Sequence, residues 1–185
     1  MKKSLFILAV AAIVALFSSC NKEEVGGTAV QDLAGQWMVY ADIVDDNGEV
    51  VVEDFNEGAF MILTYNNNAD DPNILYINDL ENFWDFIIQV PCDTKALTFG
   101  SDEYIANESY ECGVKVTDGM VLKGEATTPS GSKADYIQFD VVFDDDDAGV
   151  SFEMPELEGM TIAEAMGGTK YRFWGWRYTG LAADE

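Results

Sequence analysis

Apolar and polar positions alternate along much of the chain. In the segment GQWMVYADIV, residues 35–44, the alternation places Trp37 and Val39 on the same face. Residues 81–90 and 135–143 alternate in the same way. A period of two is typical of β-strands that bury one face, because successive side chains point to opposite sides of the sheet. The pattern therefore predicts a β-protein.

Short segments rich in Gly, Asn and Asp separate the predicted strands. Asn47-Gly48 and Asp118-Gly119 are typical of tight hairpin turns, whose central residues take positive φ. About eight to ten short strands joined by such turns predict an all-β fold, either a sandwich or a barrel. The predominance of local hairpins favours an up-and-down antiparallel barrel, in which closure removes the exposed strand edges.

A single domain is expected for residues 32–185, because no second linker and no internal repeat interrupts that stretch. Residues 20–31 contain a Gly-Gly pair and few apolar side chains, which indicates a flexible tether. One short helix is expected at residues 159–168, just before the last strand. There Thr161 and Glu164 have capping-box spacing and two glycines follow.

The N-terminal residues 1–19 have the features of an export signal. Two lysines precede residues 5–17, which are apolar throughout but shorter than the roughly 20 residues that a spanning helix needs. The following Leu-Phe-Ser-Ser-Cys, ending at Cys20, resembles the site where a lipoprotein signal peptidase cuts. We therefore expect cleavage before Cys20 and a lipid anchor on that cysteine, which would tether the protein to a membrane.

The residues directly after Cys20 carry a second resemblance. Lys22, Glu23 and Glu24 are similar to the basic residue and two acids that follow the lipidated cysteine in surface-exposed lipoproteins of Bacteroidetes. The resemblance implies an outer-membrane protein that faces the cell exterior. A polar tether without an export role, which would leave the protein on the periplasmic face, remains an alternative.

Charge and composition exclude several function classes. The chain has 34 acidic and 10 basic residues, a net charge of −24, so its surface repels nucleic acids. It contains no histidine, which excludes Ser-His-Asp triads and most catalytic zinc sites. Carboxylate acid–base chemistry stays open. No cofactor or metal site is predicted, because the acidic run at residues 144–147 lacks ordered ligand spacing and is typical of a solvated turn.

Cys92 and Cys112 are the remaining cysteines. In an exported protein they are candidates for a disulfide. Two unpaired thiols that act as small apolar side chains are the alternative, since sequence alone does not show whether the two approach closely.

Gly35-Gln36-Trp37 in the first strand, together with Arg177 in the last, resembles the lipocalin and wider calycin pattern. In that pattern an arginine of the final strand packs on the first-strand tryptophan and closes the base of the barrel. A guanidinium group over an indole is a cation–π contact, so Trp37 and Arg177 would have a structural role. Arg172 is a competing candidate for the arginine.

Longer sequence blocks resemble the Bacteroidetes lipoprotein family labelled lipid-binding putative hydrolase. The most specific are TTPSG, which starts at Thr127 and is followed by an alternating strand, and the C-terminal RYTGLAADE, which starts at Arg177. The resemblance implies a calycin-like barrel that binds a lipid. It also implies hydrolysis, although the chain has no catalytic motif that we recognise, and no catalytic residue is assigned.

Three functions remain open at this point. The first is a module that binds a small apolar or lipid-like ligand inside the barrel. The second is a non-catalytic accessory protein of a cell-surface complex, with a solid core and unknown protein partners. The third is a histidine-free carboxylate hydrolase. The residues expected to line the ligand cavity of the first function, or to fill the core of the second, are Trp84, Phe86, Ile88 and Phe139.

Overall fold

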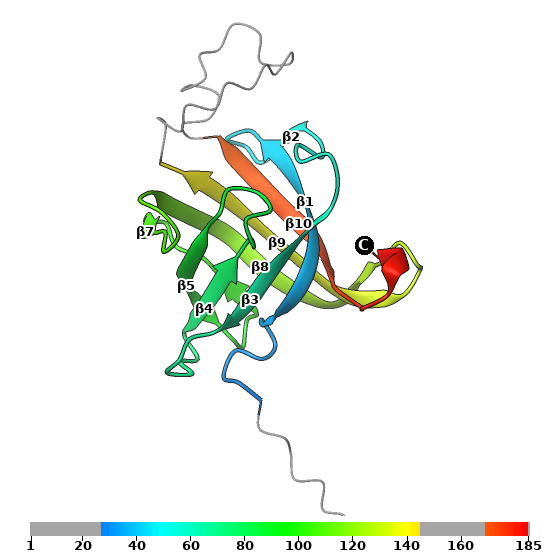
Figure 1. The fold of residues 1–185 in the computed structure, drawn as a ribbon, viewed down its shortest axis with the longest axis horizontal. Coiled ribbons are helices and arrows are strands. Elements are labelled where there is room, and N and C mark those ends of the chain that lie inside the picture. Colours follow the sequence, from blue (N-terminus) through cyan, green and yellow to red (C-terminus); the bar gives the residue numbers. More distant parts are fainter. Residues whose placement is uncertain (1–26, 145–168, 185) are drawn as a thin grey trace, which may run out of the picture.

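The computed structural model describes residues 27–144 and 169–184. Within them, eight antiparallel strands close into a barrel, in the order β1, β3, β4, β5, β6, β8, β9 and β10, with β10 pairing back to β1 (Figure 1). The strands and the single 3₁₀ turn of the described residues are β1 (Gly35–Val44), β2 (Val50–Val52), β3 (Phe60–Asn66), β4 (Ile74–Asn78), β5 (Ile87–Asp93), β6 (Thr98–Phe99), β7 (Ile105–Ala106), β8 (Gly113–Thr127), β9 (Lys133–Phe143), β10 (Lys170–Arg177) and η2 (Ala182–Asp184).

The up-and-down barrel predicted from the sequence is confirmed. Barrel strands pair with their neighbours along the chain, while β2 folds back on β1 and β7 adds to β8. The closing seam runs from Trp37 opposite Arg177 to Val44 opposite Lys170. Closure gives every barrel strand two hydrogen-bonded neighbours, so the barrel wall has no free edge.

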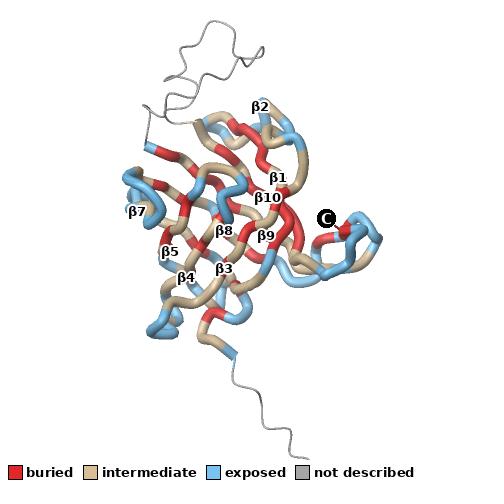
Figure 2. The backbone as a smooth tube through the Cα atoms, in the orientation of Figure 1, coloured by how far each residue is buried: buried red, intermediate tan, exposed pale blue. Residues whose placement is uncertain are grey.

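The predicted alternation locates the core. On β1, Trp37, Val39 and Ala41 are fully buried, and on β9 Ile137 and Phe139 are fully buried. These inward side chains join one apolar cluster that fills the barrel interior, shown by the buried segments that run along the strands in Figure 2. The side chains between them point outward, as the period of two requires.

The predicted turn at Asp118-Gly119 is wrong. Strand β8 continues through these residues, and its register with β9 shifts between Thr117 and Met120. Asp118 has a φ of 54°, which the strand accommodates as a β-bulge. By contrast, Asn47-Gly48 does form a turn between β1 and β2, although positive φ is found at Gly48 alone.

The strand predicted at residues 81–90 begins later than expected, at Ile87. Residues 79–86 form a loop instead, because the buried carboxyl group of Asp79 accepts hydrogen bonds from five backbone N–H groups. The donors are the amides of Glu81, Phe83, Trp84, Asp85 and Phe86, at 2.8–3.2 Å. A carboxyl group that satisfies so many donors fixes the backbone in a conformation that no strand ladder supplies.

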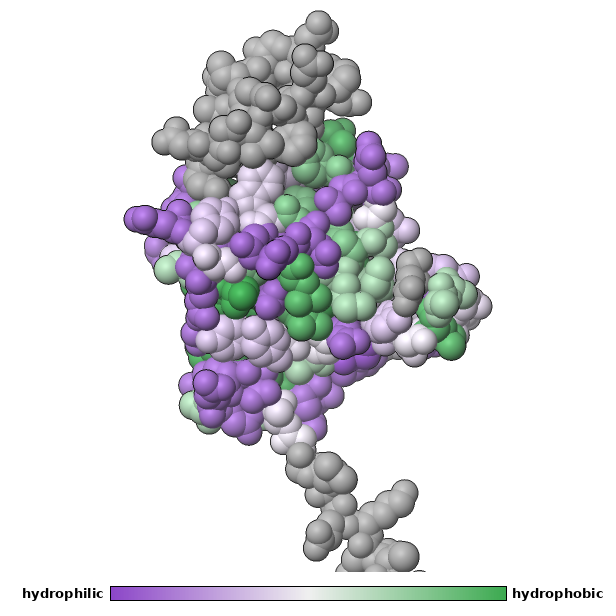
Figure 3. All heavy atoms as spheres, viewed as in Figure 1, coloured by the Kyte–Doolittle hydropathy of each residue, from purple (hydrophilic) through white to green (hydrophobic). Residues whose placement is uncertain are grey.

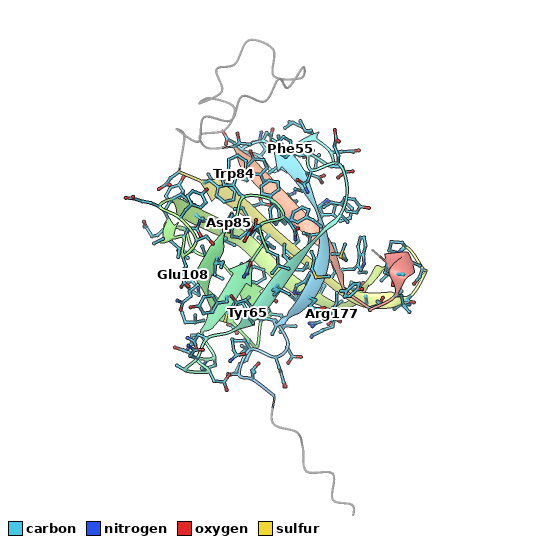
Figure 4. All side chains as sticks on the ribbon, viewed as in Figure 1. Phe55, Tyr65, Trp84, Asp85, Glu108 and Arg177 are labelled. Atoms are coloured by element: carbon cyan, nitrogen blue, oxygen red, sulfur yellow. The ribbon has the colours of Figure 1, made fainter. Side chains whose placement is uncertain are left out.

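This loop closes the upper end of the barrel in Figure 1. The ring of Phe83 stacks on Phe60 with centroids 5.7 Å apart, and it lies 4.9 Å from the ring of Phe173 across the barrel. Trp84 stacks on Phe143 at 5.4 Å. Figure 4 shows Trp84 and Phe55 together at this end. Aromatic side chains therefore fill the mouth as well as the middle of the barrel.

Several predictions fall on residues that the structure does not describe. They are the signal at residues 1–19, the residues Cys20, Lys22, Glu23 and Glu24, the helix at 159–168 and most of the acidic run at 144–147. Among the described residues, no helix has the length and apolar character that a membrane crossing requires.

Candidate functional site

The residues expected to line a cavity lie in the packed interior. Phe86, Ile88 and Phe139 have no exposed surface, and Trp84 is half-buried at the barrel mouth. The ring of Phe139 lies 5.2 Å from that of Phe173 and 5.6 Å from that of Phe99. The rings lie at ordinary packing distances from one another, and all four side chains belong to or pack against the apolar core of the barrel.

Trp37 and Arg177 meet at the lower end of the barrel. The guanidinium carbon of Arg177 lies 4.4 Å from the Trp37 ring centroid. Arg177 also donates to the carbonyl oxygen of Ala34 at 2.6 Å and to the carboxylate of Asp135 at 3.0 Å. The competing candidate, Arg172, points to the outer face, where it pairs with Asp140 at 2.8 Å. Arg177 is therefore the arginine that stacks on the tryptophan.

Cys92 and Cys112 are not joined to each other by a disulfide. Cys92 lies near the end of β5, opposite Phe99 of β6. Cys112 lies beside Asn107, whose side chain bonds the backbone of Asp85 and Ile87 at the start of β5. The two sulfurs therefore lie near opposite ends of β5, about 16 Å apart along the strand at 3.3 Å per residue, beyond the reach of a disulfide.

The outer face of the barrel carries aromatic side chains at neighbouring positions. Tyr40 of β1 lies opposite Trp174 of β10, and Trp176 of β10 lies opposite Tyr136 of β9. The Tyr40 ring centroid is 5.1 Å from that of Trp174 and 5.9 Å from that of Trp176. Trp176 and Met38 belong to a second apolar cluster, separate from the barrel core, and Tyr40 and Tyr136 pack against it. Strand pairing thus brings the rings of three strands together on the outside of the barrel. We call this surface the outer aromatic patch.

The end of the β8–β9 hairpin, residues 124–135, extends away from the barrel beside this patch (Figure 1). We call it the hairpin arm. Its tip is joined to the C-terminal segment by Asp184, which is fully buried. The Asp184 carboxylate accepts from the backbone N–H of Ser130 at 2.7 Å, from the Ser130 hydroxyl at 3.2 Å and from the Thr179 hydroxyl. We call this set of contacts the clasp.

Asp184 is ionised at neutral pH. Burial opposes the charge, but hydrogen bonds from Thr179 and Ser130 outweigh it and hold the pKa of Asp184 below its ordinary value. The carboxylate is therefore a pure acceptor, which suits the donors that converge on it. The clasp joins TTPSG to the C-terminal block, so the two most specific parts of the family resemblance lie together.

A pocket of about 440 Å³ opens between the hairpin arm and the outer aromatic patch. We call it the outer pocket. Its walls are residues 125–129 of the arm and the side chains of Tyr40, Tyr136, Trp174 and Trp176. In Figure 3, apolar surface is visible on the barrel wall next to the arm. Concave sites lined by aromatic side chains with few polar groups are the usual form of small-molecule sites.

A second pocket, of about 540 Å³, lies over β5, β6 and β8. Three carboxyl groups line it, from Asp93, Asp102 and Asp118. Within residues 27–144 and 169–184, no three metal-ligating side chains are placed so that they could hold a metal ion together. Because three carboxyl groups line this second pocket and one lines the outer pocket, an apolar ligand fits the second pocket less well.

The residues of the outer pocket were not predicted as a ligand site. A signal for them exists in the sequence: alternation assigns Tyr40, Tyr136, Trp174 and Trp176 to the faces opposite the core. Aromatic residues at outward positions of adjacent strands indicate an exposed apolar patch, which is typical of a binding surface. The arm and the clasp depend on contacts across more than 50 positions of sequence, which local patterns do not show.

The chain matches a known protein family over most of its length. The family model described as lipid-binding putative hydrolase matches residues 22–182. No curated protein matches the chain. The matched region contains the whole barrel, the hairpin arm and all residues that line the outer pocket.

Proposed function

Because the chain belongs to the lipid-binding putative hydrolase family, we propose that it binds one apolar or lipid-like molecule in the outer pocket. The observation that carries the proposal is the pocket itself, an aromatic-walled concavity on a barrel whose interior is filled by side chains. Burial of a ten-carbon chain would contribute about 0.8 kcal/mol for each CH₂ removed from water. The barrel then serves as a rigid support for a site on its outer wall.

We further propose that the protein is an outer-membrane lipoprotein anchored through Cys20 and facing the cell exterior. The sequence signal at residues 1–20 and the acidic residues after it support this location. Gly27 follows Cys20 by seven positions, which an extended chain spans in at most about 25 Å. The described chain begins at the lower end of the barrel in Figure 1, so this end would lie toward the membrane.

We do not extend the proposal to hydrolysis. The chain has no histidine, and among the described residues the wall of the outer pocket has one carboxyl group, that of Glu125. Acid–base hydrolysis by carboxylates uses two such groups, one as the acid and one as the base or nucleophile. Binding therefore accounts for the arrangement without a chemical step.

Binding is tested by isothermal titration calorimetry on residues 21–185 with 1-monodecanoylglycerol below its micellar concentration. We expect saturable binding of one molecule per chain, weakened at least tenfold by Trp174→Ala, because that indole forms part of the pocket wall. Trp84→Ala is the matched control, since Trp84 lies at the barrel mouth. Loss of binding in Trp84→Ala, with binding intact in Trp174→Ala, would place the ligand inside the barrel instead.

No binding by the wild-type chain would favour the second function, an accessory protein of a surface complex. The packed interior of the barrel agrees with that alternative, since a solid core needs no ligand. Purification of the anchored protein under mild detergent, with mass spectrometry of its stable partners, would then identify the complex.

The anchor is tested separately with Cys20→Ala in the full-length chain. We expect the wild-type protein in the membrane fraction and the variant in the soluble fraction, because stable attachment depends on the acyl chains. Metabolic labelling with an alkynyl fatty acid provides the second readout. A variant that stays in the membrane fraction, or that still incorporates the label, would contradict lipidation at Cys20.

A further inference from the structure

Trp176 has a buried hydrogen-bond donor that no other described residue satisfies. Its side chain lines the outer pocket and is only 6% exposed, and its indole Nε1–H has no partner among the described residues. The other indoles of the closing seam are satisfied. Trp37 donates to the Thr64 hydroxyl at 2.8 Å, and Trp174 donates to the Asp42 carboxylate at 2.8 Å. A buried donor without a partner costs free energy that an incoming acceptor would recover.

The charges around the outer pocket disfavour an anionic ligand. Glu125 is part of its wall, and the chain as a whole has a net charge of −24. On β10, which supplies two of the rings of the pocket wall, the guanidinium groups of Arg172 and Arg177 are each paired with an aspartate, at 2.8 and 3.0 Å. Lys133 lies opposite Thr127 in the hairpin arm, but it is exposed and is not part of the wall.

The proposed function leaves the chemical class of the lipid open. The unpaired indole N–H of Trp176 and the charges around the pocket limit which class of head group fits. A cationic head group has no acceptor to offer the indole. A pure hydrocarbon leaves the indole N–H without a partner. An anion is repelled by Glu125, and the described wall has no Lys or Arg to compensate. An uncharged lipid with an ester carbonyl or a hydroxyl supplies the acceptor and avoids the repulsion.

Resting on the proposed function, we propose that the outer pocket selects uncharged, acceptor-bearing lipids of the monoacylglycerol type, and that Trp176 Nε1–H donates to the acceptor. The acyl chain packs on the rings of Tyr40 and Trp174, and the head group lies toward Trp176 and the hairpin arm. Trp176 is thus a specificity-determining residue, distinct from the rings that supply apolar contact.

We assign to the hairpin arm the small displacement that this contact needs. The Nε1 atom is screened from water, so an acceptor reaches it only when a neighbouring element shifts. The arm begins at Gly124, where β8 has a register shift and a φ of 69°, and nothing lies within 4 Å of the position of an added Cβ. A glycine permits backbone rotation at the base of the arm, where the Gly124 N–H donates to the Asp135 carboxylate at 3.0 Å. The clasp holds the tip of the arm to the C-terminal segment.

The test compares three ligands that each have a ten-carbon acyl or alkyl chain: 1-monodecanoylglycerol, decanoate and decyltrimethylammonium, each below its micellar concentration. They are titrated by calorimetry into residues 21–185 and into Trp176→Phe, which removes the N–H and keeps an aromatic ring. We expect monodecanoylglycerol to bind more tightly than decanoate. In Trp176→Phe its affinity should fall about tenfold, in line with one hydrogen bond to a buried donor.

Urea denaturation followed by circular dichroism reports on the integrity of the variant. Because phenylalanine keeps an aromatic ring and the removed N–H has no partner among the described residues, the unfolding midpoint of Trp176→Phe should be close to that of wild type, which shows that the pocket remains folded. The inference is overturned if decanoate or decyltrimethylammonium binds most tightly, or if Trp176→Phe binds monodecanoylglycerol as well as wild type does. In either of those results the proposed lipid binding still stands, whereas failure of all three ligands to bind would contradict the proposed function itself.

Discussion

Replacement of Asp79 by alanine is expected to lower the free energy of unfolding by about 4 kcal/mol. The Asp79 carboxyl group is fully buried and accepts from five backbone amides of residues 81–86. Alanine would leave those donors without a partner, and part of the loop would have to rearrange to reach water. Urea denaturation followed by tryptophan fluorescence measures the change.

Two controls separate the lost acceptor from other effects in the loop. Asp79→Asn keeps one acceptor oxygen and should have intermediate stability. Glu81→Ala alters an exposed side chain of the same loop, while the backbone N–H that donates to Asp79 stays in place, so it should be near wild type. If Asp79→Ala unfolds within 1 kcal/mol of wild type, the carboxyl group does not organise the barrel mouth.

The second large effect is expected at Gly175, in the closing seam. A Cβ built on this residue would overlap the carbonyl oxygen of Met38 and lie 2.8 Å from the Cα of Val39. Both obstacles are backbone atoms of β1, which cannot rotate away as a side chain can. Gly175→Ala should therefore cost about 3 kcal/mol, measured by the same denaturation experiment.

Gly124→Ala is the matched control for this substitution. At Gly124 no atom lies within 4 Å of the added Cβ, so its cost of about 1 kcal/mol arises from the left-handed φ of 69°. If β1 and β10 approach as closely as the structure shows, Gly175→Ala lowers the free energy of unfolding clearly more than Gly124→Ala does. Equal costs would contradict that close approach.

The sequence predicts the barrel wall well because one physical rule applies along most of it. Side chains of a strand alternate between the core and the outside, so the inward faces of β1 and β9 can be read directly from residues 35–44 and 135–143. The closing contact of Trp37 with Arg177 could also be anticipated, because each residue type in that pair has a specific physical use.

The mispredicted segments are those in which one polar contact or one unusual φ overrides the pattern. Residues 81–86 alternate like a strand, yet the carboxyl group of Asp79 binds their amides and holds them in a loop. Asp118-Gly119 has the composition of a hairpin turn, but β9 is long enough to pair on both sides of it, so it becomes a bulge. Tertiary contacts decide both cases, and local propensity does not contain them.

The candidate site could be predicted only in part. Alternation assigns Tyr40 and Trp174 to the outward face, but their meeting depends on the register between the first and last strands. The arm is brought into place by Asp184, 54 positions away from Ser130. The unused donor of Trp176 becomes visible only when every neighbouring atom is placed. Ligand sites built from distant segments share this limitation.

Photolabelling tests the central claim most directly. Residues 21–185 are irradiated with a monoacylglycerol that carries a diazirine in its acyl chain, and the labelled peptides are located by mass spectrometry. Binding in the outer pocket predicts one label per chain, at a residue of the pocket wall, with loss of the label when unmodified monodecanoylglycerol competes. The residues of the wall are Tyr40, residues 125–129, Tyr136 and residues 174–176. Labels on residues 83–88 of the barrel mouth and interior, or labelling that no competitor reduces, would contradict the account.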